Sequence, residues 1–162
     1  MALPDGSRSV QRLVDEHYAA LYRYGYRLSG TADDASDLVQ ETYLKAQAQL
    51  GQLRDHSKAR SWLFSILRNV YLHRIRTGRN HRQVSLDNAE SLPAPAEAQP
   101  GVDPAEIQTL LNELPENFRT PLILFYFEDF SYRDIAEQMD LPIGTVMSRL
   151  ARAKAYLRSR MK

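Results

Sequence analysis

Residues 131–161 read SYRDIAEQMDLPIGTVMSRLARAKAYLRSRM, and the architecture of the C-terminal part of the chain follows from them. Ser131 and Asp134 form a capping-box pattern that predicts a helix start, with Asp in place of the usual Glu or Gln. The segment 140–144, DLPIG, predicts a turn, after which Thr145 can cap a last basic helix. Two helices joined by a tight turn are therefore expected.

This arrangement, with an arginine-rich second helix, is typical of a helix-turn-helix. Small Ala136 would let the helices cross closely, and apolar side chains would form the core between them: Ile135, Met139, Leu141, Val146 and Leu150. The outer face of the second helix would carry hydroxyls and guanidiniums suited to base edges and phosphates in a major groove: Thr145, Ser148, Arg149 and Arg152. A plain helical hairpin with a charged surface is the alternative.

Helical spacing continues on the N-terminal side of this motif. Residues 107–114 form one amphipathic helix, and Pro115 opens the next at a first-turn position that tolerates proline. Pro121 lies inside an otherwise helical run, so we expect a kink or a break there.

A segment rich in proline and alanine precedes these helices. Residues 83–104, QVSLDNAESLPAPAEAQPGVDP, hold four of the eight prolines and no aromatic residue. Proline fixes φ and removes a backbone donor, so the segment cannot form a long packed helix. We therefore expect two small helical domains, residues 10–82 and 105–162, joined by this linker.

The N-terminal domain is also expected to be helical, because apolar residues recur at spacings of three and four. A first helix should end near Ser29 and Gly30, a second should run from Thr31 towards Gly51, and a third should span about 59–77. The apolar side chains expected to line the buried stripes are Leu13, Tyr18, Leu21, Tyr22, Leu28, Leu38, Tyr43, Leu44, Trp62, Leu63, Ile66, Leu67, Val70 and Ile75. The predicted fold class is all-α.

Charge is strongly segregated, although the chain holds 21 basic and 20 acidic residues. Residues 56–86 contain seven basic and no acidic residues, and residues 141–162 contain six and none. Residues 87–140, in contrast, contain 12 acidic and two basic residues. One charged run is usually a solvated helix face, but two uncompensated basic blocks indicate a polyanion contacted at two places. DNA or RNA is the leading candidate.

Catalytic, metal and membrane sites lack support in the sequence. The absence of cysteine excludes disulfides, thiolate nucleophiles and cysteine-ligated metals. The four histidines show no metal-ligand spacing, and no GxxxxGK[ST] or GxSxG motif is present, so we expect neither cofactor nor catalytic residue. No run approaches the ~18 apolar residues of a membrane span, and the opening residues lack a signal-like apolar region. We expect a cytoplasmic protein without membrane insertion.

Three stretches together resemble one known family. Residues 111–158 resemble the fourth region of the sigma-70 family, in its extracytoplasmic-function (ECF) branch. DDASDLVQETYLKA, residues 33–46, is similar to the core-polymerase-binding helix of the family's second region. RSWLFSILRNVYLHRIR, residues 60–76, is similar to the adjoining helix that recognises and melts the minus-ten element.

The resemblance implies a specificity subunit that binds RNA polymerase core, directs it to specific promoters and assists melting of the minus-ten element. Its core contacts would be the β′ clamp helices and the β flap, with Asp37, Leu38, Gln40 and Glu41 facing the clamp helices. Asp37 and Glu41 are four apart and share a helix face suited to a basic or polar partner. An anti-sigma factor is a further partner that the resemblance implies.

The basic block after residue 56 would then lie along the minus-ten DNA. Asn69 occupies the family position associated with a flipped base, and the loop 54–58 is the expected second reader. The full set of expected minus-ten contacts is Arg54, His56, Lys58, Arg68, Asn69, His73, Arg74, Arg76 and Arg79. Trp62, in phase with the apolar stripe, is expected to be structural.

The recognition helix of the second domain would read the minus-35 element through Thr145, Ser148, Arg149 and Arg152. Two positions depart from the usual family pattern. Met147 stands where many members carry Arg or Lys, which removes a contact, and His73 stands where a short polar or acidic residue is common. Ala151 offers little beyond a methyl group.

Two other classes of function compete with this interpretation. An autonomous helix-turn-helix regulator would need a dimer to reach two half-sites, and it would not need the first domain. An enzyme would need a catalytic constellation, and the acidic clusters have no matching histidine beside them.

Overall fold

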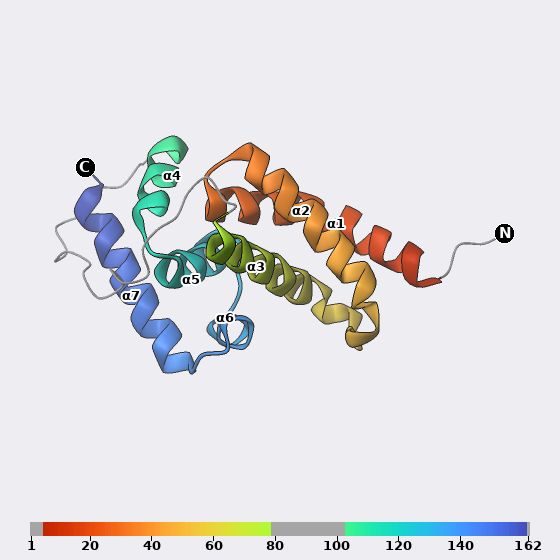
Figure 1. Ribbon diagram of the computed structural model, residues 1–162. Coiled ribbons are helices and arrows are strands. Elements are labelled where there is room, and N and C mark those ends of the chain that lie inside the picture. Colours follow the sequence, from red (N-terminus) through yellow and green to blue (C-terminus); the bar gives the residue numbers. More distant parts are fainter. Residues whose placement is uncertain (1–4, 79–102, 162) are drawn as a thin grey trace. The chain divides into compact units, whose positions relative to one another are not determined.

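The computed structural model describes residues 5–78 and 103–161, and all regular elements in these ranges are helical (Figure 1). The chain divides into two compact units, Met1–His81 and Arg82–Lys162. The all-α prediction, with a helix-turn-helix in the C-terminal part, is confirmed. The predicted linker, 83–104, lies almost wholly outside the described residues.

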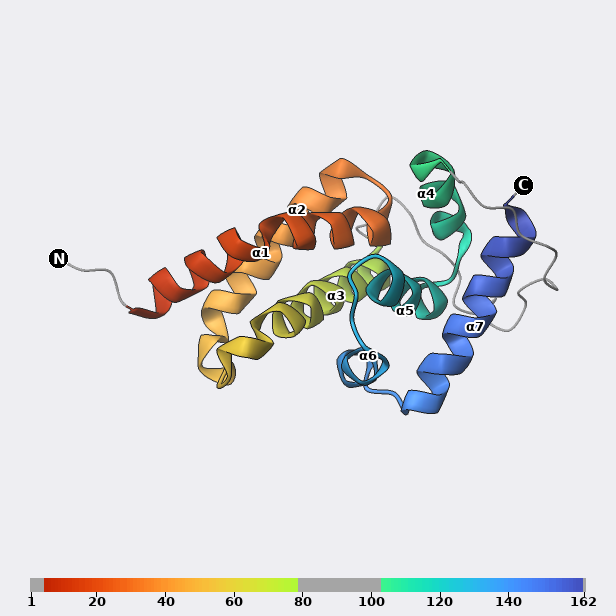
Figure 2. The same cartoon turned by 180° about the vertical axis from the view of Figure 1, so that it is seen from behind.

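The first unit is built from three long helices, α1 (Asp5–Ser29), α2 (Ala32–Ala48) and α3 (Ala59–Thr77). All three pack against one another, and Figures 1 and 2 show α1 and α2 lying side by side. Two short 3-10 turns, η1 (Leu50–Gln52) and η2 (His56–Lys58), connect α2 to α3. At the centre, the ring of Tyr24 stacks on that of Phe64 with 4.7 Å between centroids.

The turn between α1 and α2 is formed by Gly30 and Thr31, close to a contact between the two helices. A Cβ at Gly25 would lie 3.4 Å from the Ala35 Cα, an ordinary van der Waals distance, which shows that the two helices are in close contact here. Gly30 ends α1 with a φ of 89°, in the region that favours glycine. Thr31 then caps α2 by accepting a 3.1 Å hydrogen bond from the Asp34 amide.

The prediction of which side chains are buried in this unit is partly wrong. Tyr18 and Leu44 are exposed, and Tyr22, Tyr43, Trp62 and Ile75 are half-buried. The core instead takes Val10, Val14, Tyr24, Ala35, Val39, Thr42, Ala46, Phe64 and Tyr71 alongside the predicted leucines. Helical spacing of three and four admits two adjacent faces, and only the neighbouring helices decide which of them is covered.

The second unit begins with α4 (Pro104–Glu113) and α5 (Glu116–Tyr126). Pro115 is the N-cap of α5 rather than a residue of its first turn. The break considered at Pro121 is absent, since α5 continues through it. A proline there removes one amide donor, and its ring is buried in the core, where packing supports the helix.

A buried arginine holds α4 and α5 together. The Arg119 side chain is 1% exposed, and its Nε and Nη2 donate to the Leu114 carbonyl at 3.2 and 2.7 Å. Leu114 is the C-cap of α4, so the guanidinium satisfies a carbonyl at the helix end. Nothing in the sequence distinguishes Arg119 from a surface arginine, because only the tertiary fold shows that it is buried.

The helix-turn-helix consists of α6 (Tyr132–Met139) and α7 (Ile143–Arg160). Ser131 caps α6 as predicted, accepting a 3.1 Å hydrogen bond from the Asp134 amide. Asp140 ends α6 with a φ of 55°. The expected cap at Thr145 is wrong: α7 begins at Ile143 after Pro142, whose carbonyl accepts from the Thr145 amide at 3.0 Å.

The core between α6 and α7 is the one expected, except that Leu141 is only half-buried. Tyr156 of α7 reaches α4, where its hydroxyl donates a 2.8 Å hydrogen bond to Glu113 Oε2. Burial, and then the Glu113 contact, raise the pKa of Tyr156, which keeps the phenol protonated as the donor.

Candidate functional site

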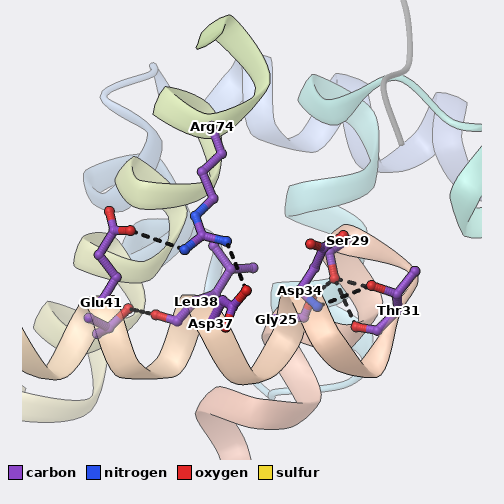
Figure 3. Close-up of polar contacts among 9 residues, drawn as sticks. Gly25, Ser29, Thr31, Asp34, Asp37, Leu38, Glu41 and Arg74 are labelled. Carbon is purple, nitrogen blue, oxygen red and sulfur yellow. Dashed lines mark hydrogen bonds and ion pairs between the residues drawn. The ribbon is translucent and has the colours of Figure 1, made fainter. Parts of the chain in front are cut away.

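An ion-pair cluster links the acidic face of α2 to the basic helix α3 (Figure 3). Arg74 Nη2 lies 3.0 Å from Glu41 Oε1, and Arg74 Nη1 lies 3.9 Å from Asp37 Oδ2. The Arg74 side chain is 13% exposed, that of Glu41 27% and that of Asp37 62%. Asp37 therefore remains largely available to a partner, whereas Glu41 is already engaged within the unit.

The four residues expected to contact polymerase differ in their exposure to solvent. Asp37 and Gln40 are exposed and Glu41 is half-buried. Leu38 is 0% exposed and lies in the core, so its assignment to the contact surface is wrong. A fully buried leucine cannot touch a partner; it holds α2 against its neighbours and thereby positions the carboxylates.

Most of the expected minus-ten residues lie on accessible surface. Arg54, His56, Lys58, Asn69, His73 and Arg76 are exposed, and Arg68 is half-buried. Arg74 is turned towards the carboxylates of α2, so a phosphate would have to compete with them for its guanidinium. Arg79 lies outside the described residues.

Asn69 and His73 lie together at the edge of a hollow between α2 and α3. The hollow measures about 230 Å³ and is also lined by Lys45, Gln49, Ile66 and Val70. The lining is mixed, with Ile66 and Val70 as its apolar part and the Asn69 amide and His73 imidazole beside them. Such a mixture suits an unstacked base, which needs a surface for its ring and partners for its polar edge. Asn69 is thus an exposed residue that lines this hollow.

The loop 54–58, expected to make the second contact with the minus-ten DNA, is held by hydrogen bonds to the Asp55 carboxylate. Asp55 accepts hydrogen bonds from the Ser57 hydroxyl at 2.7 Å and from the Ser57 amide at 3.0 Å. These bonds lower the pKa of Asp55, so the loop keeps a fixed negative charge. His56 and Lys58 stay exposed on the turn that Asp55 caps.

The four expected minus-35 residues line a single hollow at the start of α7. It measures about 320 Å³ and includes Asn117, Phe118 and Gly144 in addition to Thr145, Ser148, Arg149 and Arg152. The guanidinium carbon of Arg152 lies 5.0 Å from the centre of the Phe118 ring, a cation–π contact. Ser148 is exposed, whereas Thr145, Arg149 and Arg152 are half-buried and form a flank of α7.

The exposed side of α7 also carries residues that were not expected to contact DNA. Ile143 and Met147 are 42% and 49% exposed, and Ala151 is exposed one turn further on. Their spacing of four was visible in the sequence. That this ridge faces away from the core depends on the packing of α7 against α5 and α6.

Within residues 5–78 and 103–161 no group of three or more His, Asp or Glu side chains is placed to hold a metal ion. None of the helices described is both long and apolar enough to cross a membrane.

Family models match both units. The model of sigma-70 region 2 matches residues 13–81, and the model of sigma-70 region 4 matches residues 105–157. The chain belongs to the sigma-70 family. The two matched regions cover most of this sigma factor, in the order expected from the sequence.

Curated relatives place this sigma factor in the ECF branch. It is 36% identical to the ECF RNA polymerase sigma factor EcfG of Rhodopseudomonas palustris over 143 residues, which are 85% of this chain and 77% of the relative. It is 34% identical to SigL of Mycobacterium tuberculosis over 153 residues, covering 92% of this chain and 86% of SigL.

Two solved structures are similar in fold to this chain. The sigma factor RpoE of Bartonella quintana, crystallised with the anti-sigma factor NepR, superposes with a TM-score of 0.73 at 31% identity, covering 93% of this chain and 94% of RpoE. CnrH, solved with the cytosolic domain of CnrY, has a TM-score of 0.67 at 23% identity, and this likeness supports the fold alone.

Proposed function

We propose that this ECF sigma factor binds the RNA polymerase core, directs it to specific promoters and assists melting of the minus-ten element. The observation that carries the proposal is the presence of both sigma regions in one chain, each with a basic surface. The protein acts by binding and positioning, and no side chain is assigned a catalytic step.

The polymerase contact is assigned to the exposed part of α2. Asp37 and Gln40 project from it, and Glu41 joins them at the edge of the Arg74 ion pair. Carboxylates at this spacing suit a basic helical partner, which here would be the β′ clamp helices of the core. The second unit would contact the β flap.

Promoter reading is divided between the two units. In the first, a base flipped from the minus-ten duplex would enter the hollow beside Asn69, while His56 and Lys58 contact the neighbouring strand. In the second, the helix-turn-helix places α7 in the major groove of the minus-35 element. Arg149 and Arg152 lie on one flank, where they can contact phosphate and guanine edges.

An anti-sigma factor is the proposed regulator, because RpoE, at 31% identity, was crystallised with one. The proposed place of action is the cytoplasm, where bacterial RNA polymerase transcribes.

Reconstitution tests the function. Purified chain is mixed with cognate core polymerase, and transcripts initiated on a genomic library are sequenced at their 5′ ends. We expect initiation at a limited set of sites that share two upstream elements. Failure to associate with core, or specific duplex binding by a dimer of the chain alone, would favour the autonomous regulator instead.

A further inference from the structure

The outward face of α7 carries an apolar ridge on an otherwise basic element. Ile143, Met147 and Ala151 follow one another at intervals of four residues, and the first two are 42% and 49% exposed. At 1.5 Å per residue the ridge is about 12 Å long, which equals the rise of three to four base pairs of B-form DNA.

The packing of α7 shows which way this ridge points. The buried side chains of α7 are Val146, Leu150, Ala153 and Tyr156. On a helix with 3.6 residues per turn, Met147 lies about 100° and Ala151 about 140° around the axis from Val146, so both lie outside the buried side, on the exposed side that includes Ser148. In a helix-turn-helix, this side of the second helix faces the base edges of the major groove.

Charge favours DNA as the occupant of this face. Residues 141–162 contain six basic residues and no acidic residue, so α7 itself suits a polyanion. Glu137 and Asp140, together with Arg133, line the hollow beside Ile143, so the favourable charge lies towards Met147 and Ala151. The apolar group that the major groove offers is the C5-methyl of thymine, and apolar side chains contact it in specific complexes. A methionine is unbranched and adaptable, which suits contact with a small group on a base edge.

We propose that Met147, with Ile143 and Ala151 beside it, reads thymine C5-methyl groups in the upstream promoter element. The flank formed by Arg149 and Arg152 positions α7 through phosphate and base contacts, and the ridge selects thymine over cytosine at the positions it covers. Met147 is then a determinant of specificity rather than a lost contact. The inference rests on the proposed function of α7 as the minus-35 reader.

Deoxyuridine tests this directly, because it differs from thymidine only by the absent methyl. Holoenzyme is formed with core polymerase, its upstream element is obtained by selection from random DNA, and each thymine in the element is replaced by deoxyuridine. For the wild type, at least one replacement should weaken binding about fourfold, as expected for one buried methyl group. The same replacement should change binding by Met147→Gln holoenzyme less than about 1.5-fold.

Met147→Leu is the matched control, since it keeps an apolar side chain of similar size and should keep the sensitivity to deoxyuridine. An element without thymine, no effect of deoxyuridine on the wild type, or an equal effect on wild type and Met147→Gln would each overturn the inference. It would also be overturned if Met147→Gln weakened association with core in the absence of DNA and left the deoxyuridine response unchanged. These outcomes differ from failure of the proposed function, in which no promoter-binding holoenzyme forms.

Discussion

Arg74 of α3 donates a 3.0 Å hydrogen bond to Glu41 of α2, which lies 33 positions earlier in the chain (Figure 3). The bond joins the helix proposed to bind polymerase to the helix proposed to bind the minus-ten DNA. Arg74 also lies 3.9 Å from Asp37. The Arg74 Nε is buried and has no hydrogen-bond partner among the described residues, so its guanidinium is held through the two terminal nitrogens.

Removing this arginine should destabilise the first unit. Arg74→Ala leaves the half-buried Glu41 without its cation, and we expect the free energy of unfolding to fall by about 1–2 kcal/mol, between the values for exposed and buried pairs. Urea denaturation followed by circular dichroism measures the change. Arg76→Ala, an exposed arginine of the same helix, should cost less than about 0.5 kcal/mol. Additive effects of Arg74→Ala and Glu41→Ala would show that the pair contributes nothing.

Loss of the α2 carboxylates should weaken core binding. Asp37→Ala with Glu41→Ala should raise the dissociation constant for core polymerase about tenfold, because two charges facing a basic partner are lost. Asp37→Ala alone is the cleaner test, since Asp37 is 62% exposed and only weakly tied to Arg74. Asp33→Ala, in the first turn of the same helix, is the control. Unchanged co-purification of the double variant with polymerase would remove this assignment.

Asn69→Ala should impair promoter opening more than core binding. The amide at the edge of the α2–α3 hollow can donate to and accept from a flipped base, and its loss should reduce open-complex formation about tenfold. Permanganate footprinting detects the unpaired thymines. Gln47→Ala removes an exposed amide from α2 and should leave opening intact. Normal permanganate reactivity in Asn69→Ala would contradict the assignment.

Arg149→Ala should reduce use of the upstream element. A lost guanidinium contact to a base or phosphate should lower transcription from promoters with that element about tenfold. Run-off transcription on promoters with intact and scrambled elements measures the effect. Arg152→Ala should lower thermal stability as well, because Arg152 also lies over the Phe118 ring. Equal loss on both promoters would indicate that Arg149 does not read the element.

Acidification should destabilise the first unit through His17. Burial lowers the pKa of His17 below its ordinary value of 6.5; Glu16 partly offsets this and Arg60 adds to it. The unfolded chain therefore takes up the proton first, so stability falls as the pH drops below 6.5 and levels off below the folded pKa. Urea denaturation at about pH 7.5 and about pH 5.5 should show a smaller drop for His17→Gln than for the wild type. Equal drops would exclude His17 as the source.

Local signals predicted much of this architecture because they act over a few residues. The third helix was expected at about 59–77 and is observed as Ala59–Thr77, where Gly78 takes a φ of 73° that ends it. The predicted cap at Ser131 is also confirmed, because a capping box acts over only four residues. The cap predicted at Thr145 is wrong, because Pro142 supplies a preset φ and caps α7 three residues earlier.

The amino-acid sequence alone determined the helices, the two-part organisation, the segregation of charge and the family, since these depend on short-range periodicity and on composition. The tertiary structure alone decided that Leu38 is buried, that Arg74 is paired with Glu41, and that Met147 is exposed on α7 whereas Arg149 is half-buried. Each of these depends on which side of a helix its neighbours cover. Helical spacing leaves that open until segments distant in the chain pack together.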